Sequence, residues 1–379
     1  DWKEKRRRKL DRGRGPATVT VAHETTSNAP YYARFIIRAG QTVNEVFAQI
    51  LALLPPEGGQ IVFMEGVYEY DGDIIIDRDN VSIKGQGEGT KFVLKAGTTS
   101  STGGITASGK SGLEISDLAM NGQREQQNEE YFHDGVYLIN CRNSKISGLK
   151  VYNFLNRGAR LQGCEEVEVL SSTLNDNNNN LYAEDCENLT VTGNNARKSR
   201  ADCIFFTKTN NSIITNNFCN QTVYQQYMWI NGIRLLGCNS VTVSDNVCSE
   251  NSGNGILVEA LNPFTPDEEM CLDLIISGNQ CNSNYYHHGM KIFKAKRATI
   301  TNNTCCFNGG EQSYEGNGID LDSSDDCSIQ NNTLTDNLSY GISISGRKNL
   351  VTNNDCQNNG VNGIYNGGQN TKLDPGNRT

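Results

Sequence analysis

The chain has 379 residues, 36% of them hydrophobic and 20% charged, and its formal net charge is −9 at pH 7. Because nucleic-acid binding requires a basic surface, this acidic balance excludes nucleic acid as the expected partner. No stretch approaches the roughly 20 consecutive apolar residues of a membrane span, so we expect no membrane partner either.

The N-terminal segment is polar and locally basic. Residues 2–16, WKEKRRRKLDRGRGP, contain no apolar core segment and are too polar for a signal peptide. We expect a solvated linker trimmed from a longer protein. Residues 1–30 are therefore assigned to this segment, and residues 31–379 to a single domain.

An amphipathic helix is predicted next, at about residues 42–54, within TVNEVFAQILALLPP. Thr42 and Glu45 have the spacing of a capping box, and Pro55 ends the helix. Its apolar face is formed by Val43, Val46, Phe47, Ile50 and Leu54.

From residue 134 onward the chain is an internal repeat. Segments such as DGVYLINC (134–141), NGIRLLGC (231–238) and NGIDLDSS (317–324) return at steps of 22 or 23 residues, with three longer steps between residues 202 and 318. A second strand follows in each unit, and both strands alternate apolar and polar residues. A repeat this short cannot bury its apolar face alone. We predict an all-β solenoid of about 10–12 stacked coils, with the helix covering its first coil.

Asparagine and cysteine recur at fixed places in the repeat. An asparagine suits a tight turn, and its amide can bond to the amides of the coils above and below. The thirteen cysteines form no CxxC pair, and they recur at intervals close to the repeat. We therefore expect stacked, reduced thiols in the core rather than disulfides. The asparagines assigned to the end of the second strand are Asn195, Asn217, Asn246, Asn279, Asn303, Asn332 and Asn354.

The alternation also predicts which side chains of the first strand point outward. Counting from the small residue that opens each strand, the second and fourth residues form two outer columns, with coils about 4.8 Å apart. Lys291 is then one coil before Asp320, and Glu259 is two coils before Asp322. One column contains Tyr182, Ile204, Arg234, Leu257, Lys291 and Asp320, and the other contains Glu184, Phe206, Leu236, Glu259, Phe293 and Asp322.

We predict Glu259, Lys291, Asp320 and Asp322 as catalytic residues. Asp320 and Asp322 are neighbours on the outer face, about 6.7 Å apart at their backbones. Inverting glycosidases hold their two carboxyl groups about 6.5–9.5 Å apart, so that a water fits between them. Crowded carboxylates raise one pKa, which leaves a proton for the leaving oxygen. Lys291 either neutralises a uronate or acts as the base of a β-eliminating lyase. The alternative interpretation is a solvated strand whose charges pair across coils.

Substrate contacts are expected from the same columns and from the lengthened repeats. Two of these repeats contain aromatic stretches, at residues 221–230 and 282–288, and aromatic rings suit the faces of sugars. The predicted substrate-binding residues are Arg160, Tyr182, Glu184, Arg234, Tyr224, Tyr227, Trp229, Tyr285, Tyr286 and His287.

No metal site and no cofactor is predicted. Calcium is the alternative, because calcium favours clustered oxygens and four aspartates lie close together in the sequence. They match no loop-type calcium motif, so this signal is weak. The four residues are Asp320, Asp322, Asp325 and Asp326.

The repeats resemble the right-handed parallel β-helix proteins of the pectate-lyase superfamily, over about residues 58–370. Residues 58–94, GGQIVFMEGVYEYDGDIIIDRDNVSIKGQGEGTKFVL, are similar to the opening coils of members that include mannuronan C-5 epimerases and phage tail or appendage proteins. The epimerases carry an Asp-Pro-His-Glu stretch where this chain has Arg160, Gln162 and Glu165, without the histidine. Epimerase chemistry is therefore not favoured.

The resemblance implies a polysaccharide-cleaving enzyme, a hydrolase or lyase that acts on an acidic glycan in a groove on the β-helix face. A phage tail or appendage depolymerase fits this description. One alternative is a β-eliminating lyase or C-5 epimerase, and another is a non-catalytic glycan-binding or structural shaft. The resemblance to phage spikes further implies a homotrimer and an extracellular or virion-associated location.

Overall fold

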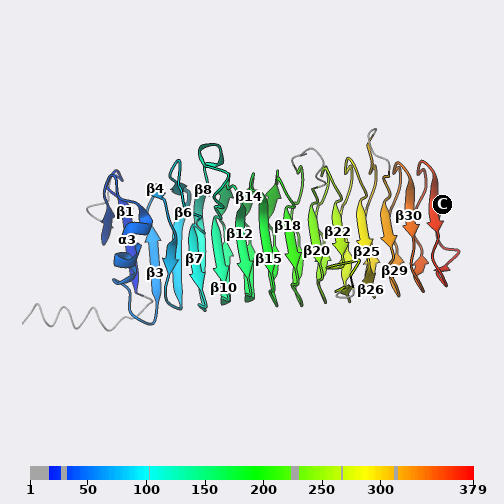
Figure 1. The fold of residues 1–379 in the computed structure, drawn as a ribbon, viewed down its shortest axis with the longest axis horizontal. Helices are drawn as coiled ribbons and strands as arrows, with labels where there is room; N and C mark the ends of the chain where they lie inside the picture. Colours follow the sequence, from blue (N-terminus) through cyan, green and yellow to red (C-terminus); the bar gives the residue numbers. More distant parts are fainter. Residues whose placement is uncertain (1–16, 27–31, 102, 223–229, 266–267, 311–314) are drawn as a thin grey trace, which may run out of the picture.

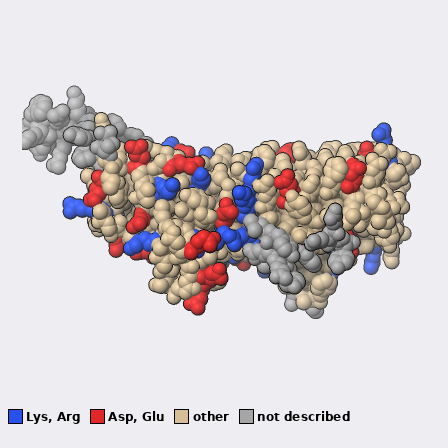
Figure 2. Space-filling model, turned by 90° about the horizontal axis from the view of Figure 1, so that it is seen from above, with Lys and Arg blue, Asp and Glu red and all other residues tan. Residues whose placement is uncertain are grey.

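The computed structural model describes residues 17–26, 32–101, 103–222, 230–265, 268–310 and 315–379. The chain winds into one elongated solenoid, with its first coils at one end and its last coils at the other (Figure 1). Seen from above, acidic and basic side chains are interspersed, without a broad field of either sign (Figure 2).

Parallel strands of successive coils make up the sheets of the solenoid. The sheet that carries the predicted site has twelve strands and is called the front sheet. Its strands are β5 (Ile74–Ile76), β7 (Ile105–Ser108), β9 (Val136–Ile139), β12 (Arg157–Gln162), β15 (Asn179–Glu184), β18 (Ile204–Thr207), β20 (Ile233–Leu236), β22 (Ile256–Glu259), β25 (Met290–Phe293), β28 (Ile319–Asp322), β30 (Tyr340–Ile344) and β32 (Asn362–Asn366).

A second sheet contains nineteen of the described strands. They are β1 (Thr18–His23), β2 (Phe35–Ile37), β3 (Gly59–Phe63), β4 (Gly66–Tyr70), β6 (Val81–Leu94), β8 (Glu114–Asn121), β10 (Arg142–Ser147), β11 (Lys150–Tyr152), β13 (Glu165–Leu170), β14 (Thr173–Asn175), β16 (Thr190–Thr192), β17 (Asn195–Arg197), β19 (Ile213–Thr215), β21 (Thr242–Ser244), β24 (Ile275–Ser277), β27 (Thr299–Thr301), β29 (Ser328–Gln330), β31 (Leu350–Thr352) and β33 (Lys372–Leu373). The short strands β23 (Cys271–Leu272) and β26 (Ala295–Lys296) form a third sheet.

The first coil is covered by helix α3 (Val43–Leu51), which lies at the N-terminal end of the solenoid (Figure 1). The Glu45 carboxylate accepts the Thr42 backbone N–H at 2.9 Å, as the predicted capping box requires. The helix buries its apolar face against the coil, and it ends three residues before the predicted position. Strand β1 pairs with β3 and lies within residues 1–30, the range that the sequence assigned to a polar segment.

The register of the front sheet confirms the predicted columns at most positions. Lys291 pairs with Asp320, and Asp320 pairs with Ser343. Glu259 pairs with Phe293, which pairs with Asp322. Neighbouring residues of these columns therefore come from successive coils.

Two positions of the predicted columns are wrong. Ile204 and Phe206 are fully buried, whereas Phe205 and Thr207 occupy the outer columns, in register with Arg234 and Leu236. The prediction counted from Asp202, but Cys203 takes the place that glycine holds in other coils. A shift of one residue moves every side chain of a strand to the opposite face.

Asparagine side chains form a continuous ladder inside the coils. The Asn217 side-chain amide donates to Asn246 Oδ1 at 3.0 Å, and the Asn246 amide donates to Asn279 Oδ1 at 3.0 Å. The ladder begins at Asn194 rather than at the predicted Asn195. Each buried amide therefore finds partners within the stack, and this satisfies groups whose burial is otherwise costly.

All thirteen cysteines are buried and free, in agreement with the expected core thiols. Burial raises the pKa of Cys219, Cys248 and Cys281 well above the usual value for a thiol. These residues act as small apolar side chains that stack between coils.

Candidate active site

A ladder of polar side chains runs along the N-terminal ends of the front-sheet strands. It is formed by the residue immediately before the small residue, usually glycine, that opens each strand. Asn231 Oδ1 accepts the Asn254 N–H at 3.0 Å, and Asn254 Oδ1 accepts the His288 N–H at 3.2 Å. His288 Nδ1 in turn accepts the Asn317 N–H at 3.1 Å. We call this series the opening ladder. Its members satisfy backbone donors that the strand pairing leaves over.

Three members of the opening ladder accept the N–H of the next coil with an ionisable side chain instead of asparagine. They are Asp134, Asp202 and His288. One oxygen of each aspartate accepts the N–H of the next coil, at 2.8 Å from Arg157 and 2.9 Å from Asn231. The second oxygen of each aspartate faces an ionisable residue of that next coil, and Nε2 of His288 does the same. The partners are Arg160 at 3.8 Å, Arg234 at 3.6 Å and Asp320 at 3.7 Å.

His288 is fully buried, and its hydrogen bonding fixes its tautomer. Because Nδ1 accepts the Asn317 N–H, the neutral ring carries its proton on Nε2. Nε2 lies 3.7 Å from Asp320 Oδ2 and 3.8 Å from Glu315 Oε2. Burial is the main reason why the His288 pKa lies well below its ordinary value, and Lys291 lowers it further. His288 therefore directs a neutral N–H toward two carboxyl groups.

Asp320 and Asp322 line a polar pocket of about 310 Å³ on the outer face of the front sheet. Lys291 Nζ lies 3.3 Å from Asp320 Oδ2. Asp320 is only 8% exposed, and burial raises its pKa in spite of the nearby lysine. The other residues that line the pocket are Glu315, Asn317, Ser339, Tyr340, Ser343, Ser345 and Tyr365.

Asp322 has different surroundings from Asp320, although both belong to β28. Its Oδ1 accepts the hydroxyl protons of Ser345 at 3.0 Å and Ser323 at 2.9 Å. These two hydroxyl donors hold the Asp322 carboxylate in one orientation. The two carboxyl groups of the pocket thus differ in burial and in hydrogen bonding, and this difference suits an acid and a base.

Two tyrosines form an aromatic wall beside these carboxyl groups. The rings of Tyr340 and Tyr365 lie 5.3 Å apart between centroids, at an interplanar angle of 32°. Tyr365 is 51% exposed, so one ring is open to a ligand. Aromatic faces of this kind provide flat apolar contact area with a polar edge.

Glu259 lies in the predicted column but is not among the residues that line this pocket. Its carboxylate accepts hydrogen bonds from Arg234, with the Nε contact at 2.7 Å. Arg234 also faces Asp202, and its guanidinium stacks 4.7 Å from the centroid of the Phe205 ring. The structure therefore divides the predicted catalytic group. It brings Lys291, Asp320 and Asp322 together, and it pairs Glu259 with Arg234 in a separate cluster.

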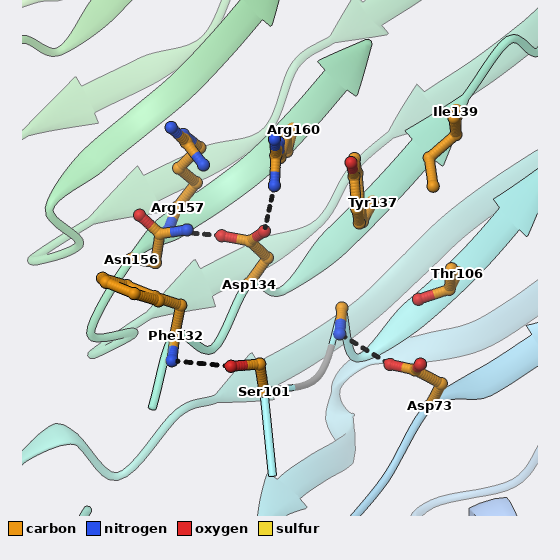
Figure 3. A pocket seen from close by; sticks show the side chains of 11 residues that line it. Asp73, Ser101, Thr106, Phe132, Asp134, Tyr137, Ile139, Asn156, Arg157 and Arg160 are labelled. Carbon is orange, nitrogen blue, oxygen red and sulfur yellow. Dashed lines mark hydrogen bonds and ion pairs between the residues drawn. The ribbon is translucent and has the colours of Figure 1, made fainter. Parts of the chain in front are cut away.

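A larger pocket, of about 500 Å³, lies toward the N-terminal end of the front sheet (Figure 3). Asp134 and Arg160 face each other in it, beside Tyr137 (Figure 3). We call it the arginine pocket. Its lining residues are Asp73, Ser101, Gly103, Thr106, Phe132, Asp134, Tyr137, Ile139, Asn156, Arg157 and Arg160.

The remaining predicted substrate contacts fall in three places. Tyr182 and Glu184 are in register with Arg160 and Gln162, next to the arginine pocket. The His287 ring lies 5.7 Å from the His288 ring, and burial lowers the His287 pKa to about 4. Tyr285 is exposed and Tyr286 is half-buried in the same loop. Tyr224, Tyr227 and Trp229 lie outside the described residues.

The sequence reasoning missed His288, Asp134 and Asp202 as members of one set. The signal was present in the repeat, because these residues occupy a position where other coils have asparagine. Aligning the residue before each opening residue, rather than only those after it, would have found them. Arg157 was missed as well, because the loops before the regular repeat supply the other side of its pocket.

The four aspartates that suggested calcium do not converge. Asp325 Oδ1 accepts the Arg347 N–H at 2.7 Å, and Asp326 pairs with Lys296 at 3.6 Å, both apart from the pocket of Asp320 and Asp322. Among the described residues, no three His, Cys, Asp or Glu side chains form a set that could hold a metal ion.

Comparisons with known proteins identify the fold. Residues 219–377 match the family described as periplasmic copper-binding protein (NosD), and residues 134–266 match the family described as right handed beta helix region. No curated protein matches the sequence of the chain.

Several solved structures are similar to the chain. The A-module of the Azotobacter vinelandii mannuronan C-5 epimerase AlgE6 has a TM-score of 0.73 at 16% identity, covering 89% of this chain and 95% of that chain. The Dettilon tailspike protein has a TM-score of 0.69 at 15% identity, covering 86% of this chain and 65% of that chain. The catalytic domain of a GH87 alpha-1,3-glucanase, solved with tetrasaccharides, has a TM-score of 0.57 at 14% identity, covering 90% of this chain and 68% of that chain.

Copper, which the first of these family descriptions names, does not fit the described residues. They contain no three-residue set of metal-binding side chains, and the cysteines are buried in the core. A cysteine binds a metal as its thiolate, whereas burial favours the protonated thiol of Cys219 and Cys248 by raising its pKa. Within the described part of the chain, no helix has the length and apolar character needed to cross a membrane.

Proposed function

We propose that this chain, a right-handed parallel β-helix of the pectate-lyase-like superfamily, is an enzyme that cleaves an acidic polysaccharide on the outer face of its front sheet. The observation that carries the proposal is the pocket in which Asp320, Asp322 and Lys291 meet. Two carboxyl groups with opposite environments beside one cation suit acid–base cleavage of a charged glycan.

Asp320 is the proposed general acid. Its raised pKa favours a carboxyl group that still holds its proton when the substrate binds. That proton passes to the glycosidic oxygen as its bond to the anomeric carbon breaks. The carboxylate that remains is stabilised by the Lys291 ammonium, 3.3 Å away, and by the Nε2–H of His288.

Asp322 is the proposed general base. It takes a proton from a water molecule whose oxygen forms the new bond to the anomeric carbon, while Ser345 and Ser323 hold the carboxylate in place. The two residues are two positions apart on β28, so their backbones are separated by about 6.7 Å. An inverting hydrolase needs room for a water between its two carboxyl groups, and two side chains on the same face of a strand can provide that room.

Lys291 favours an acidic glycan as the substrate. Its amine lies in the pocket, 3.3 Å from Asp320 Oδ2, where a positive charge neutralises a uronate. The exposed Tyr365 ring supplies a surface on which a sugar ring can stack.

The similar structures support the substrate class. They include a mannuronan epimerase, an alpha-1,3-glucanase in complex with tetrasaccharides, and a tailspike. A location outside the cell or on a virion, and assembly into a homotrimer, are consistent with the tailspike similarity and form part of the proposal.

The test is incubation of the protein with a panel of acidic polysaccharides. We expect new reducing ends without the ultraviolet absorbance of unsaturated uronates. Absorbance that rises together with cleavage would identify a lyase and refute the assigned roles. If no polysaccharide on the panel is cut but one is bound, the chain is a glycan-binding shaft instead.

Asp322→Asn is the decisive variant, and Asp273→Asn is its matched control. Asp273 pairs with Arg297 at 2.6 Å outside the front sheet, so its loss removes one carboxylate without touching the pocket. If Asp322→Asn cuts as fast as the unmodified protein, the proposed site is wrong.

A further inference from the structure

We propose that the arginine pocket binds a carboxylate-bearing sugar residue of the glycan, as a second site apart from Asp320 on the same sheet. This inference rests on the proposed function only for the identity of the polymer. Arg160 and Asp320 stand in one outer column and are separated by six strand spacings, about 29 Å.

Two stacked arginines form one wall of the pocket. The Arg157 guanidinium lies 4.0 Å from the centroid of the Tyr182 ring, and that of Arg160 lies 4.3 Å from the Tyr137 ring. Stacking holds a guanidinium in one orientation and leaves its N–H edge open for a planar anion. Nε of both arginines is buried, whereas the Arg160 side chain keeps 23% of its surface exposed and lines the pocket. Its terminal N–H groups are the donors that suit a carboxylate.

The opposite wall combines polar and apolar groups in the manner of a sugar site. Asp73 Oδ1 accepts the Gly103 N–H at 2.7 Å, and Ser101 Oγ accepts the Phe132 N–H at 3.2 Å (Figure 3). Thr106 adds a hydroxyl, and the Phe132 ring is 63% exposed at the rim. Sugar sites combine a few fixed polar groups with aromatic surface in this way.

Arg157 and Arg160 are the cations that a ligand anion meets in the pocket. They are opposed by Asp134, by the more distant Asp73, and by Glu184, whose charge acts on Arg157. Asp134 is 4% exposed, and burial raises its pKa even though both arginines act to lower it. Asp134 Oδ2 lies 3.8 Å from Arg160 Nη1, too far for a hydrogen bond, so this guanidinium group keeps N–H donors for a ligand carboxylate.

The opening ladder explains why Asp134 is there and provides the key variant. Its Oδ1 holds the Arg157 N–H, a task that asparagine performs elsewhere in the ladder. Asp134→Asn therefore keeps the backbone contact and removes the charge that competes with a bound carboxylate. If the pocket binds an anion, this substitution strengthens binding, whereas a site for a cation would be weakened by it.

Calorimetry with trimers of galacturonic acid and of mannuronic acid, and with maltotriose as the neutral control, tests the proposal. We expect Arg160→Gln to weaken uronate binding about tenfold to hundredfold, the usual range for hydrogen bonds to a charged group. Asp134→Asn should tighten uronate binding several-fold. Arg142→Gln, which removes an exposed arginine paired with Glu165 on the second sheet, is the control and should change nothing.

The outcomes separate this proposal from the proposed function. Uronate binding that is unchanged in Arg160→Gln, or weakened in Asp134→Asn, overturns the proposal, as does equal binding of maltotriose. Asp322→Asn should leave the arginine-dependent binding intact. If no polysaccharide is cleaved but the arginine-dependent binding is found, the proposed cleavage fails and the pocket stands.

Discussion

Replacing His288 with asparagine separates the structural role of this residue from its chemical one. His288 Nδ1 accepts the Asn317 N–H, and an asparagine Oδ1 at this position can do the same, as Asn254 does one coil earlier. The variant therefore keeps the opening ladder and loses the Nε2–H that faces Asp320 at 3.7 Å. The variant should fold like the unmodified protein, and its kcat should be lower.

The size of the effect follows from the contact that is lost. Nε2 lies 3.7 Å from Asp320 Oδ2 and has no hydrogen-bond partner among the described residues, so the contact must shorten as charge develops on Asp320. A hydrogen bond to a charged group contributes about 1.5–3 kcal/mol, and we take the lower end. Because about 1.4 kcal/mol corresponds to a factor of ten, kcat should fall about tenfold. KM should change little, since the donor acts on the Asp320 carboxylate that forms as the proton leaves.

Stability provides a second measurement on the same variant. Burial holds the His288 pKa below its ordinary value, so as the pH falls this histidine binds a proton in the unfolded chain before it does so in the folded chain. Stability should therefore fall as the pH drops below about 6.5, the ordinary histidine pKa. His288→Asn should show a smaller loss, measured as the urea-unfolding free energy at pH 7.5 and pH 5.

Two control variants make the result interpretable. His288→Ala removes the acceptor as well, leaves the buried Asn317 N–H unpaired, and should cost about 1–3 kcal/mol of stability. Asn254→Ala breaks the ladder at a residue outside the pocket, so it should lower stability and spare kcat. If His288→Asn retains full kcat with an unchanged pH dependence of stability, the assigned role of Nε2 is wrong.

Three further outcomes are expected. Asp322→Asn should lower kcat by about 10² or more with little change in Tm, in reducing-end assays and thermal melts, and a loss below tenfold would contradict its role as base. Because burial raises the Asp320 pKa, kcat should fall on the alkaline side as Asp320 loses its proton, at a pH above the ordinary aspartate range. A kcat that climbs through that range would contradict the acid role. Asn279→Ala should cost about 1–3 kcal/mol in urea unfolding, since it removes the acceptor of the Asn246 backbone and side-chain N–H groups, and an unchanged midpoint would refute the ladder.

The register of the front sheet could be predicted because its period is fixed wherever glycine opens the strand. Lys291 and Asp320 were placed one coil apart on this basis, and they form an ion pair. The same counting failed at Phe206, because Cys203 replaces the glycine and the count began one residue too early. A shift of one residue assigns every side chain of the strand to the wrong face.

Contacts between the two columns could not be predicted from the repeat. Arg234 reaches diagonally to Glu259, because a long side chain can choose among several neighbours at similar distances. The predicted columns contain only residues that lie directly opposite each other on successive strands. Glu259 was therefore grouped with Asp322, which is in the same column. The arginine pocket escaped prediction for a related reason. Its far wall comes from Asp73 and Ser101, which precede the regular repeat.

A crystal structure of the Asp322→Asn variant, soaked with an oligosaccharide of the polymer that the protein cleaves, tests the central claim most directly. The account predicts sugar density along the outer face of the front sheet, with a glycosidic oxygen beside Asp320 and a ring over Tyr365. Density confined to the second sheet, or a scissile bond remote from β28, would contradict it.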